Sequence, residues 1–292
     1  MEYLVFGDLC YSTGPEHIET KENAYLHVKD GKCLAVYESL PSNCSALEIK
    51  DYRGKLVLPG MVDLHLHAPQ YAYRGTKMDL PLLDWLNINT FPEEAKYRDT
   101  DYARAAYRNF VEDLKESPTT RAVIFGTLHK DATLCLMELL EESGLETMAG
   151  KVNMDRNSPD YLTEHSAEES LKNTREWLEE IPKNYRHFRP ILTPRFTPTC
   201  SDELLLGLGK MMEEKGIPLQ SHLSENKAEI AWVSELCPGT RNYGESYDRY
   251  RLLNHTVMAH CVHTGEEELY LLIERGCFIC HCPQSNTNLQ SG

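Results

Sequence analysis

The sequence predicts an α/β fold: a (β/α)8 TIM-like barrel, C-terminally incomplete in this chain, preceded by a small N-terminal β-sandwich-like module. From residue 59 onward, short apolar runs alternate with long amphipathic stretches. This alternation is typical of parallel strands connected by helices. Residues 1–58 instead hold short apolar runs separated by Gly, Pro, Asp and Asn, a pattern that indicates β-strands joined by tight turns. We therefore expect two domains, 1–58 and 59–292.

In the first domain we expect strands at residues 3–6, 24–28, 33–37 and 55–58, and Asp30-Gly31-Lys32 is a good hairpin turn. The pattern favours an antiparallel module. The second domain is expected to hold seven strands, at residues 60–67, 121–128, 147–154, 189–196, 218–223, 257–262 and 277–282. Helical periodicity predicts helices over residues 102–115, 166–180, 201–215 and 227–236.

The eighth strand of a closed barrel is absent from the prediction, because residues 288–292 form a polar segment directly after the seventh strand. We interpret the chain as a C-terminally incomplete version of a longer protein. A complete, open seven-stranded sheet is the alternative. In such a barrel, catalytic side chains are expected at the C-terminal ends of the strands.

Composition limits the function classes. The net charge of −15 over 292 residues argues against a nucleic-acid partner, which would need a basic surface. No apolar stretch approaches the ~18 residues of a membrane span, and the N-terminus lacks the basic region of a signal peptide. The ten scattered Cys are expected to be reduced thiols, and Cys277–Cys282 is interpreted as a structural strand. These features favour a cytoplasmic protein with a small-molecule substrate.

His65 and His67 lie one residue apart at the end of an apolar run. On a strand they point to the same side, so two neutral imidazoles can hold a divalent metal such as Zn²⁺. His222 ends the fifth predicted strand and is expected to be a third ligand. Glu225 follows after a short turn, where a proton shuttle would reach over the metal. The alternatives are a buried structural histidine and a solvated acid near a helix start.

Further polar residues follow other strands. His260 is a candidate fourth ligand or a donor beside the metal, whereas His263 and His281 are expected to be structural. Arg195 and Phe196 lie at the end of the fourth predicted strand; Arg195 offers a rigid fork of donors and Phe196 an aromatic face. No Asp or Glu follows Cys282, so the chain offers no carboxylate ligand after the seventh strand.

These residues resemble the amidohydrolase superfamily and, within it, the guanine deaminases. The segments that carry the resemblance are 59–71, 80–86, 193–198, 220–225, 259–263 and 281–286. The resemblance implies one Zn²⁺ on His65, His67 and His222, although Fe²⁺ suits the same imidazoles. It further implies Glu225 as proton shuttle, His260 beside the nucleophilic water, and Gln70, Arg195 and Phe196 around a purine. The strand-four region lacks the Lys that bridges two ions in two-metal relatives, which favours a single metal.

The expected reaction is hydrolytic deamination of guanine to xanthine and ammonia. The departure from the family pattern is the absent strand eight, on which the family places a metal-binding Asp. Two alternatives therefore stay open. One is a related amidohydrolase acting on cytosine, an adenosine-type compound or a triazine, and the other is an inactive truncated binding or scaffold protein. A homodimer is a further expectation from this architecture.

Overall fold

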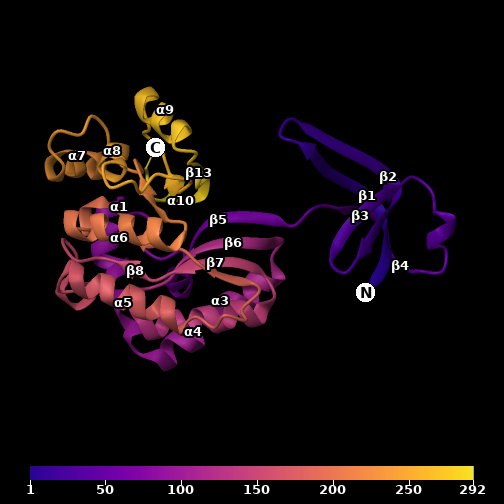
Figure 1. Ribbon diagram of the computed structural model, residues 1–292, viewed down its shortest axis with the longest axis horizontal. Helices are drawn as coiled ribbons and strands as arrows, with labels where there is room; N and C mark the ends of the chain where they lie inside the picture. Colours follow the sequence, from indigo (N-terminus) through magenta and orange to yellow (C-terminus); the bar gives the residue numbers. More distant parts are fainter. Residues whose placement is uncertain (292) are drawn as a thin grey trace. The chain divides into compact units, whose positions relative to one another are not determined.

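The computed structural model describes residues 1–291 and divides the chain into two compact units, Met1–Met61 and Val62–Gly292. The division falls close to the expected boundary between residues 58 and 59. Each unit has its own sheets and buried side chains. Figure 1 colours the chain by sequence, with the first unit in indigo and violet and the end of the second in yellow.

The first unit is a four-stranded sheet in the order β3-β2-β1-β4. Its strands are β1 (Glu2–Gly14), β2 (His17–Lys29), β3 (Lys32–Tyr37) and β4 (Glu48–Val57). Asp30 and Gly31 connect β2 to β3 with φ angles of 49° and 77°, the left-handed values of the predicted hairpin turn. The antiparallel prediction is wrong for β4, which pairs parallel to β1. A connection containing a 3-10 helix, Ser42–Cys44, separates β3 from β4 and is long enough for this crossover.

The second unit carries parallel strands that follow one another in chain order. The three sheets have the orders β5-β6-β7-β9, β10-β8 and β11-β12-β13, and the bridge Leu192↔Leu219 continues the pairing toward β11. The strands are β5 (Met61–His67), β6 (Thr119–Phe125), β7 (Glu146–Gly150), β8 (Val152–Asn153), β9 (Phe188–Pro190), β10 (Thr193–Pro194), β11 (Gln220–Leu223), β12 (Val257–His260) and β13 (Phe278–Cys280). Each predicted barrel strand therefore exists, and the third and fourth are interrupted.

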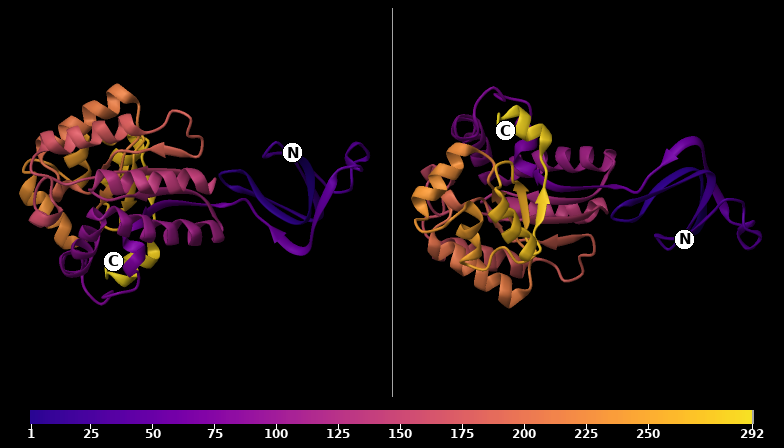
Figure 2. Two further views of the ribbon diagram at one scale, coloured as in Figure 1. Left: turned by 90° about the horizontal axis from the view of Figure 1, so that it is seen from below. Right: turned by 90° about the horizontal axis from the view of Figure 1, so that it is seen from above.

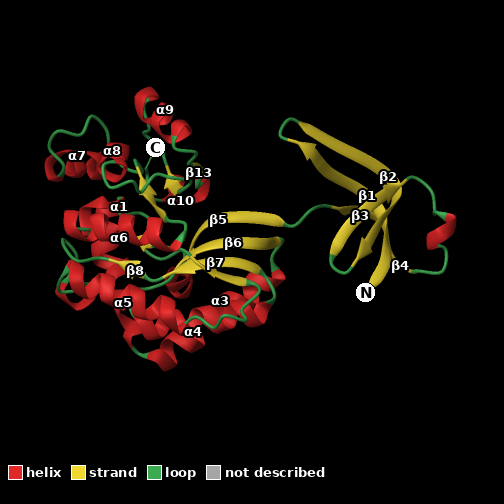
Figure 3. Cartoon of the chain, in the orientation of Figure 1, coloured by secondary structure: helices red, strands yellow, loops and turns green. Residues whose placement is uncertain are grey.

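Helices connect these strands, as expected for a β/α barrel, and lie outside the strands β5–β7 in Figure 3. They are α1 (Leu82–Trp85), α2 (Phe91–Glu94), α3 (Thr100–Glu116), α4 (Lys130–Ser143), α5 (Ala167–Glu180), α6 (Asp202–Lys215), α7 (Lys227–Leu236), α8 (Tyr243–Asp248), α9 (Glu266–Glu274) and α10 (Pro283–Asn288). Local sequence fixes their ends. For α6, the Ser201 hydroxyl accepts from the Leu204 N–H, and Gly216 ends the helix at φ 64°.

The strand set is open at one side. Within residues 1–291 no pairing joins β13 to β5, which agrees with the predicted incomplete barrel. Both of these strands expose apolar side chains, including Val62 at 55% and Phe278 at 56%. The apolar run that ends at His67 is only partly buried, because β5 is an edge strand here and has a neighbour on one side only. In the two views of Figure 2, the helices of the second unit lie around its strands.

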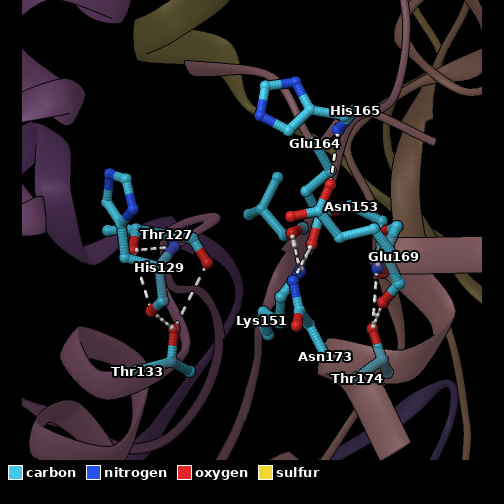
Figure 4. A network of polar contacts seen from close by, with 12 residues as sticks. Thr127, His129, Thr133, Lys151, Asn153, Glu164, His165, Glu169, Asn173 and Thr174 are labelled. Atoms are coloured by element: carbon cyan, nitrogen blue, oxygen red, sulfur yellow. Dashed lines mark hydrogen bonds and ion pairs between the residues drawn. The ribbon is translucent and has the colours of Figure 1, made fainter. Parts of the chain in front are cut away.

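A buried polar network lies beyond β7 (Figure 4). The Lys151 ammonium donates to Glu164 Oε1 at 2.6 Å and to the Val152 carbonyl at 3.0 Å. Asn173 also donates to Glu164 Oε1, at 3.2 Å. Lys151 and Glu164 are almost completely buried, so each charge depends on the other for compensation. Among the described residues, no helix has the length and apolar character needed to cross a bilayer.

Candidate metal centre and active site

The three predicted ligands converge. His65 and His67 alternate with Leu66 on β5, so both face the same side, and His222 comes from β11. Their ligand nitrogens lie within 4.8 Å of one another. His67 Nε2 and His222 Nε2 are 3.0 Å apart, near the ~3.4 Å that separates two ligands each ~2.1 Å from one tetrahedral ion. The geometry thus brings three imidazoles to one point.

Hydrogen bonding orients His222 for ligation. Its Nδ1–H donates to the Arg195 carbonyl oxygen at 2.6 Å, which leaves the lone pair of Nε2 pointing at His67. His67 Nδ1 is buried and has no partner among the described residues. Because one ring nitrogen of His222 is committed to a carbonyl, the other is the free ligand atom.

Burial keeps these imidazoles neutral. Desolvation lowers the pKa of His65, His67 and His222 well below the usual value, and the neighbouring His and Arg195 charges add to this effect. A metal ligand must be deprotonated, so a depressed pKa favours cation binding over proton binding. A cluster of three neutral imidazole nitrogens fits Zn²⁺ in both donor type and number.

Glu225 lies at the edge of this cluster in the turn between β11 and α7, and it is 4% exposed. Burial raises the pKa of Glu225 to about 8, so the carboxyl holds a proton near neutral pH. Its Oε2 lies 3.4 Å from His260 Nε2. The pair can therefore share or pass a proton.

His260 ends β12 with a left-handed φ of 73°. Its Nδ1–H donates to Asn286 Oδ1 at 2.8 Å, and this bond turns Nε2 toward Glu225. Such a backbone angle is unfavourable for a bulky residue and is maintained by its surroundings. Asn286, on α10, lies in the segment 281–286 that carries the family resemblance, but the sequence analysis gave it no role.

A cavity of about 50 Å³ joins these groups. All eight predicted site residues line it: His65, His67, Gln70, Arg195, Phe196, His222, Glu225 and His260. The remaining wall comes from residues that sequence analysis did not select, namely Leu82, Trp85, Leu86, Glu229, Ser285 and Leu289. The cavity therefore places proton-holding, metal-ligating and planar side chains together.

Arg195 is the side chain whose surroundings differ most from expectation. It is almost completely buried and forms a bidentate pair with Glu94, with Nη1–Oε2 at 2.7 Å and Nη2–Oε1 at 3.2 Å. The sequence predicted a fork of donors free for a substrate, and the structure shows one edge of that fork already bound. Glu94 has no local sequence signal, because its partner is 101 residues away.

His263 and the cysteines are the other metal-binding residue types that the sequence analysis considered. His263 Nε2 bonds to the Ser291 carbonyl oxygen. The ten cysteines are free thiols, as expected. The interpretation of Cys277–Cys282 as purely structural is incomplete, because Cys282 Sγ lies within 4.8 Å of ligand atoms of His65 and His260.

Comparison with known proteins decides the family. Residues 56–292 match the model of the Amidohydrolase family. The chain belongs to the amidohydrolase family. It is 41% identical to a guanine deaminase of Rattus norvegicus over 99% of its own length and 66% of that protein. The chain thus spans just under two thirds of this curated relative.

Solved structures agree with this family assignment. A guanine deaminase from C. acetobutylicum with bound guanine in the active site matches with a TM-score of 0.96 and 44% identity, over 100% of this chain and 70% of that one. An adenosine deaminase from xanthomonas campestris with bound zn matches at 22% identity with a TM-score of 0.79, over 99% of this chain and 64% of that one. The second likeness concerns the fold. The resemblance inferred from the sequence is therefore confirmed.

Proposed function

We propose that this protein is a metal-dependent guanine deaminase, which hydrolyses guanine to xanthine and ammonia. The observation that carries the proposal is the single cavity shared by three converging imidazoles, a protonated Glu225 and the Arg195–Phe196 pair. The similarity to a guanine deaminase with bound guanine supports this choice of substrate. A cytoplasmic location and a homodimer stay predictions from the sequence.

His65, His67 and His222 would hold one Zn²⁺, with Fe²⁺ as the alternative ion. Zinc in the adenosine deaminase of the same fold supports this assignment. When bound, the ion supplies Lewis-acid activation of water at neutral pH. The depressed pKa of each imidazole keeps the lone pairs available for it.

The residues of the chain account for the proton movements. The water oxygen adds at C2 of guanine, and the C2–amino bond breaks as ammonia leaves. Glu225 would give its proton to the adjacent ring nitrogen, take up the two protons of the water in turn, pass one of them to the departing amine and end protonated again. His260, held by Asn286, would accept a hydrogen bond from the attacking water through Nε2.

Purine recognition would use the other cavity residues. Arg195 can donate to the O6 and N7 acceptors of guanine, a pairing of matched geometry. Gln70 offers a donor and an acceptor to the base edge, and Phe196 an aromatic face. The cavity of about 50 Å³ is far smaller than the ~300 Å³ of typical ligand pockets.

The function is tested by ammonia release from the zinc-loaded protein, with guanine, adenosine, cytosine and a triazine as substrates. Guanine should be preferred. Glu225→Gln should nearly abolish turnover while the zinc content stays at the wild-type value, and Glu235→Gln, an exposed change on α7, should leave both unchanged. Preference for another ring would replace the substrate assignment. No ammonia from any substrate would favour a binding or scaffold protein.

A further inference from the structure

We infer that Glu94 is a positioning residue, whose carboxylate holds the Arg195 guanidinium in the orientation that receives the C6 carbonyl oxygen of the purine. The inference rests on the function proposed above and deepens it. Glu94 does not line the cavity, whereas Arg195 does. Any effect of Glu94 on substrate selection must therefore pass through Arg195.

The geometry of the pair leaves part of the guanidinium available. Glu94 accepts from Nη1 and Nη2, which is the end-on edge of the fork. Arg has five N–H donors in a fixed plane, so Nε–H and one further N–H on each terminal nitrogen remain. The side edge formed by Nε–H and Nη2–H is the one that can pair with two adjacent acceptors of a purine.

Two contacts from one short helix restrict the rotation of Arg195. Glu94 fixes the end of the guanidinium, and Phe91 lies against its face with 5.2 Å between the guanidinium carbon and the ring centroid. Both residues belong to α2. An Arg side chain with several rotatable bonds is thereby held in one plane before any substrate arrives, which lowers the entropy lost on binding.

Charge balance supports the same role. Arg195 and Glu94 are 2% and 1% exposed, so an unpaired guanidinium here would lack both water and a counter-charge. The same cavity holds the three imidazoles that we propose as metal ligands. An Arg195 charge without a counter-charge would repel a metal cation bound to them. The Glu94 carboxylate neutralises Arg195 without occupying the cavity. Stability alone does not account for the pair, since apolar residues of similar size often replace buried ion pairs at no cost.

The test compares two ligands that differ at C6. Guanine carries an oxygen there, and 2-aminopurine has the same 2-amino group without it. Binding is measured in the zinc-loaded Glu225→Gln background, in which guanine is not consumed, by 2-aminopurine fluorescence and its displacement by guanine. Glu94→Gln should raise the dissociation constant of guanine about 10- to 100-fold, because the charge-assisted contact between Arg195 and the C6 oxygen loses its geometry. The same variant should raise the dissociation constant of 2-aminopurine less than about 3-fold, since that ligand makes no C6 contact.

Control variants separate positioning from folding. Glu93→Gln changes the neighbouring half-buried acid, which pairs with Lys96, and should alter neither dissociation constant. Glu94→Asp keeps the charge and should recover part of the guanine preference. If Glu94→Gln does not fold, the double variant Arg195→Met with Glu94→Leu removes the whole pair and should show the same loss of preference.

Equal weakening of both ligands by Glu94→Gln would overturn the inference and leave the pair a structural contact. An unchanged guanine preference in a folded Glu94→Gln variant, or in the double variant, would overturn it as well. The proposed function fails separately. A wild-type protein that prefers guanine over 2-aminopurine but releases no ammonia would refute the deaminase, and a loss of that preference in Glu94→Gln would still support the role of Glu94.

Discussion

Glu229 gives the chain a pH-dependent loss of stability that a single substitution should remove. Glu229 lies on α7, is 1% exposed, and accepts hydrogen bonds from the Glu225 and Asn226 N–H groups at 3.2 and 3.3 Å. Its Oε1 accepts from the Tyr243 hydroxyl at 2.8 Å. Burial raises the pKa of Glu229 from 4.5 to about 7.

The sign of the effect follows from proton binding. Between pH 4.5 and about 7 the folded state binds more protons at Glu229 than the unfolded state, so the free energy of unfolding falls as pH rises. Below pH 4.5 Glu229 is protonated in both states and contributes no pH dependence. One pKa unit corresponds to about 1.4 kcal/mol. Because the pKa of Glu229 rises from 4.5 in the unfolded chain to about 7 in the folded protein, its ionisation lowers the free energy of unfolding by about 3 kcal/mol once the pH exceeds 7.

Urea unfolding at several pH values from 4.5 to 8.5, with a chelator present throughout, measures this effect. Glu229→Gln keeps an oxygen for the two backbone donors and removes the titration. The stability of Glu229→Gln relative to wild type should therefore increase by about 3 kcal/mol across this range. Glu235→Gln, exposed on the same helix, should show a constant difference. A Glu229→Gln difference that does not change with pH would refute the reasoning.

The remaining predictions concern the buried ion pair and the metal. Lys151→Met should lower the free energy of unfolding by about 3–5 kcal/mol by leaving Glu164 buried without a counter-charge, and adding Glu164→Leu should recover most of this in chemical denaturation. Lys172→Met, exposed on α5, should change little. His222→Ala should lose zinc by elemental analysis, whereas His187→Ala should keep it; zinc retained by His222→Ala would exclude it as a ligand. Zinc should raise the Tm of the wild-type protein and leave that of His222→Ala unchanged.

Features of the sequence that act locally were predictable. Alternation along β5 places His65 and His67 on one side of a strand, and the structure has them there. Helix α6 begins after Ser201 and ends at Gly216 because capping chemistry depends on a few neighbouring residues. For the same reason, the hairpin at Asp30 and Gly31 was predicted correctly.

Features that depend on distant residues were not predictable. The pairing of Arg195 with Glu94 requires α2 to pack against the end of β10, and no periodicity in the sequence encodes that contact. Asn286 similarly acquires its partner His260 only when α10 follows β13 toward the cavity. The parallel pairing of β4 with β1 is also tertiary, because a short apolar run does not specify the direction of its neighbour.

Arg195 contributes to the site through two different parts of itself. Its guanidinium lines the cavity, while its main-chain carbonyl accepts the hydrogen bond that orients His222. Every amino acid carries that carbonyl, so the hydrogen bond to His222 Nδ1 does not depend on the side chain at this position. Exchanging Arg195 alone would leave Glu94 buried without a counter-charge, so a new specificity built at residue 195 needs a matching change at Glu94, while the three imidazoles stay as they are.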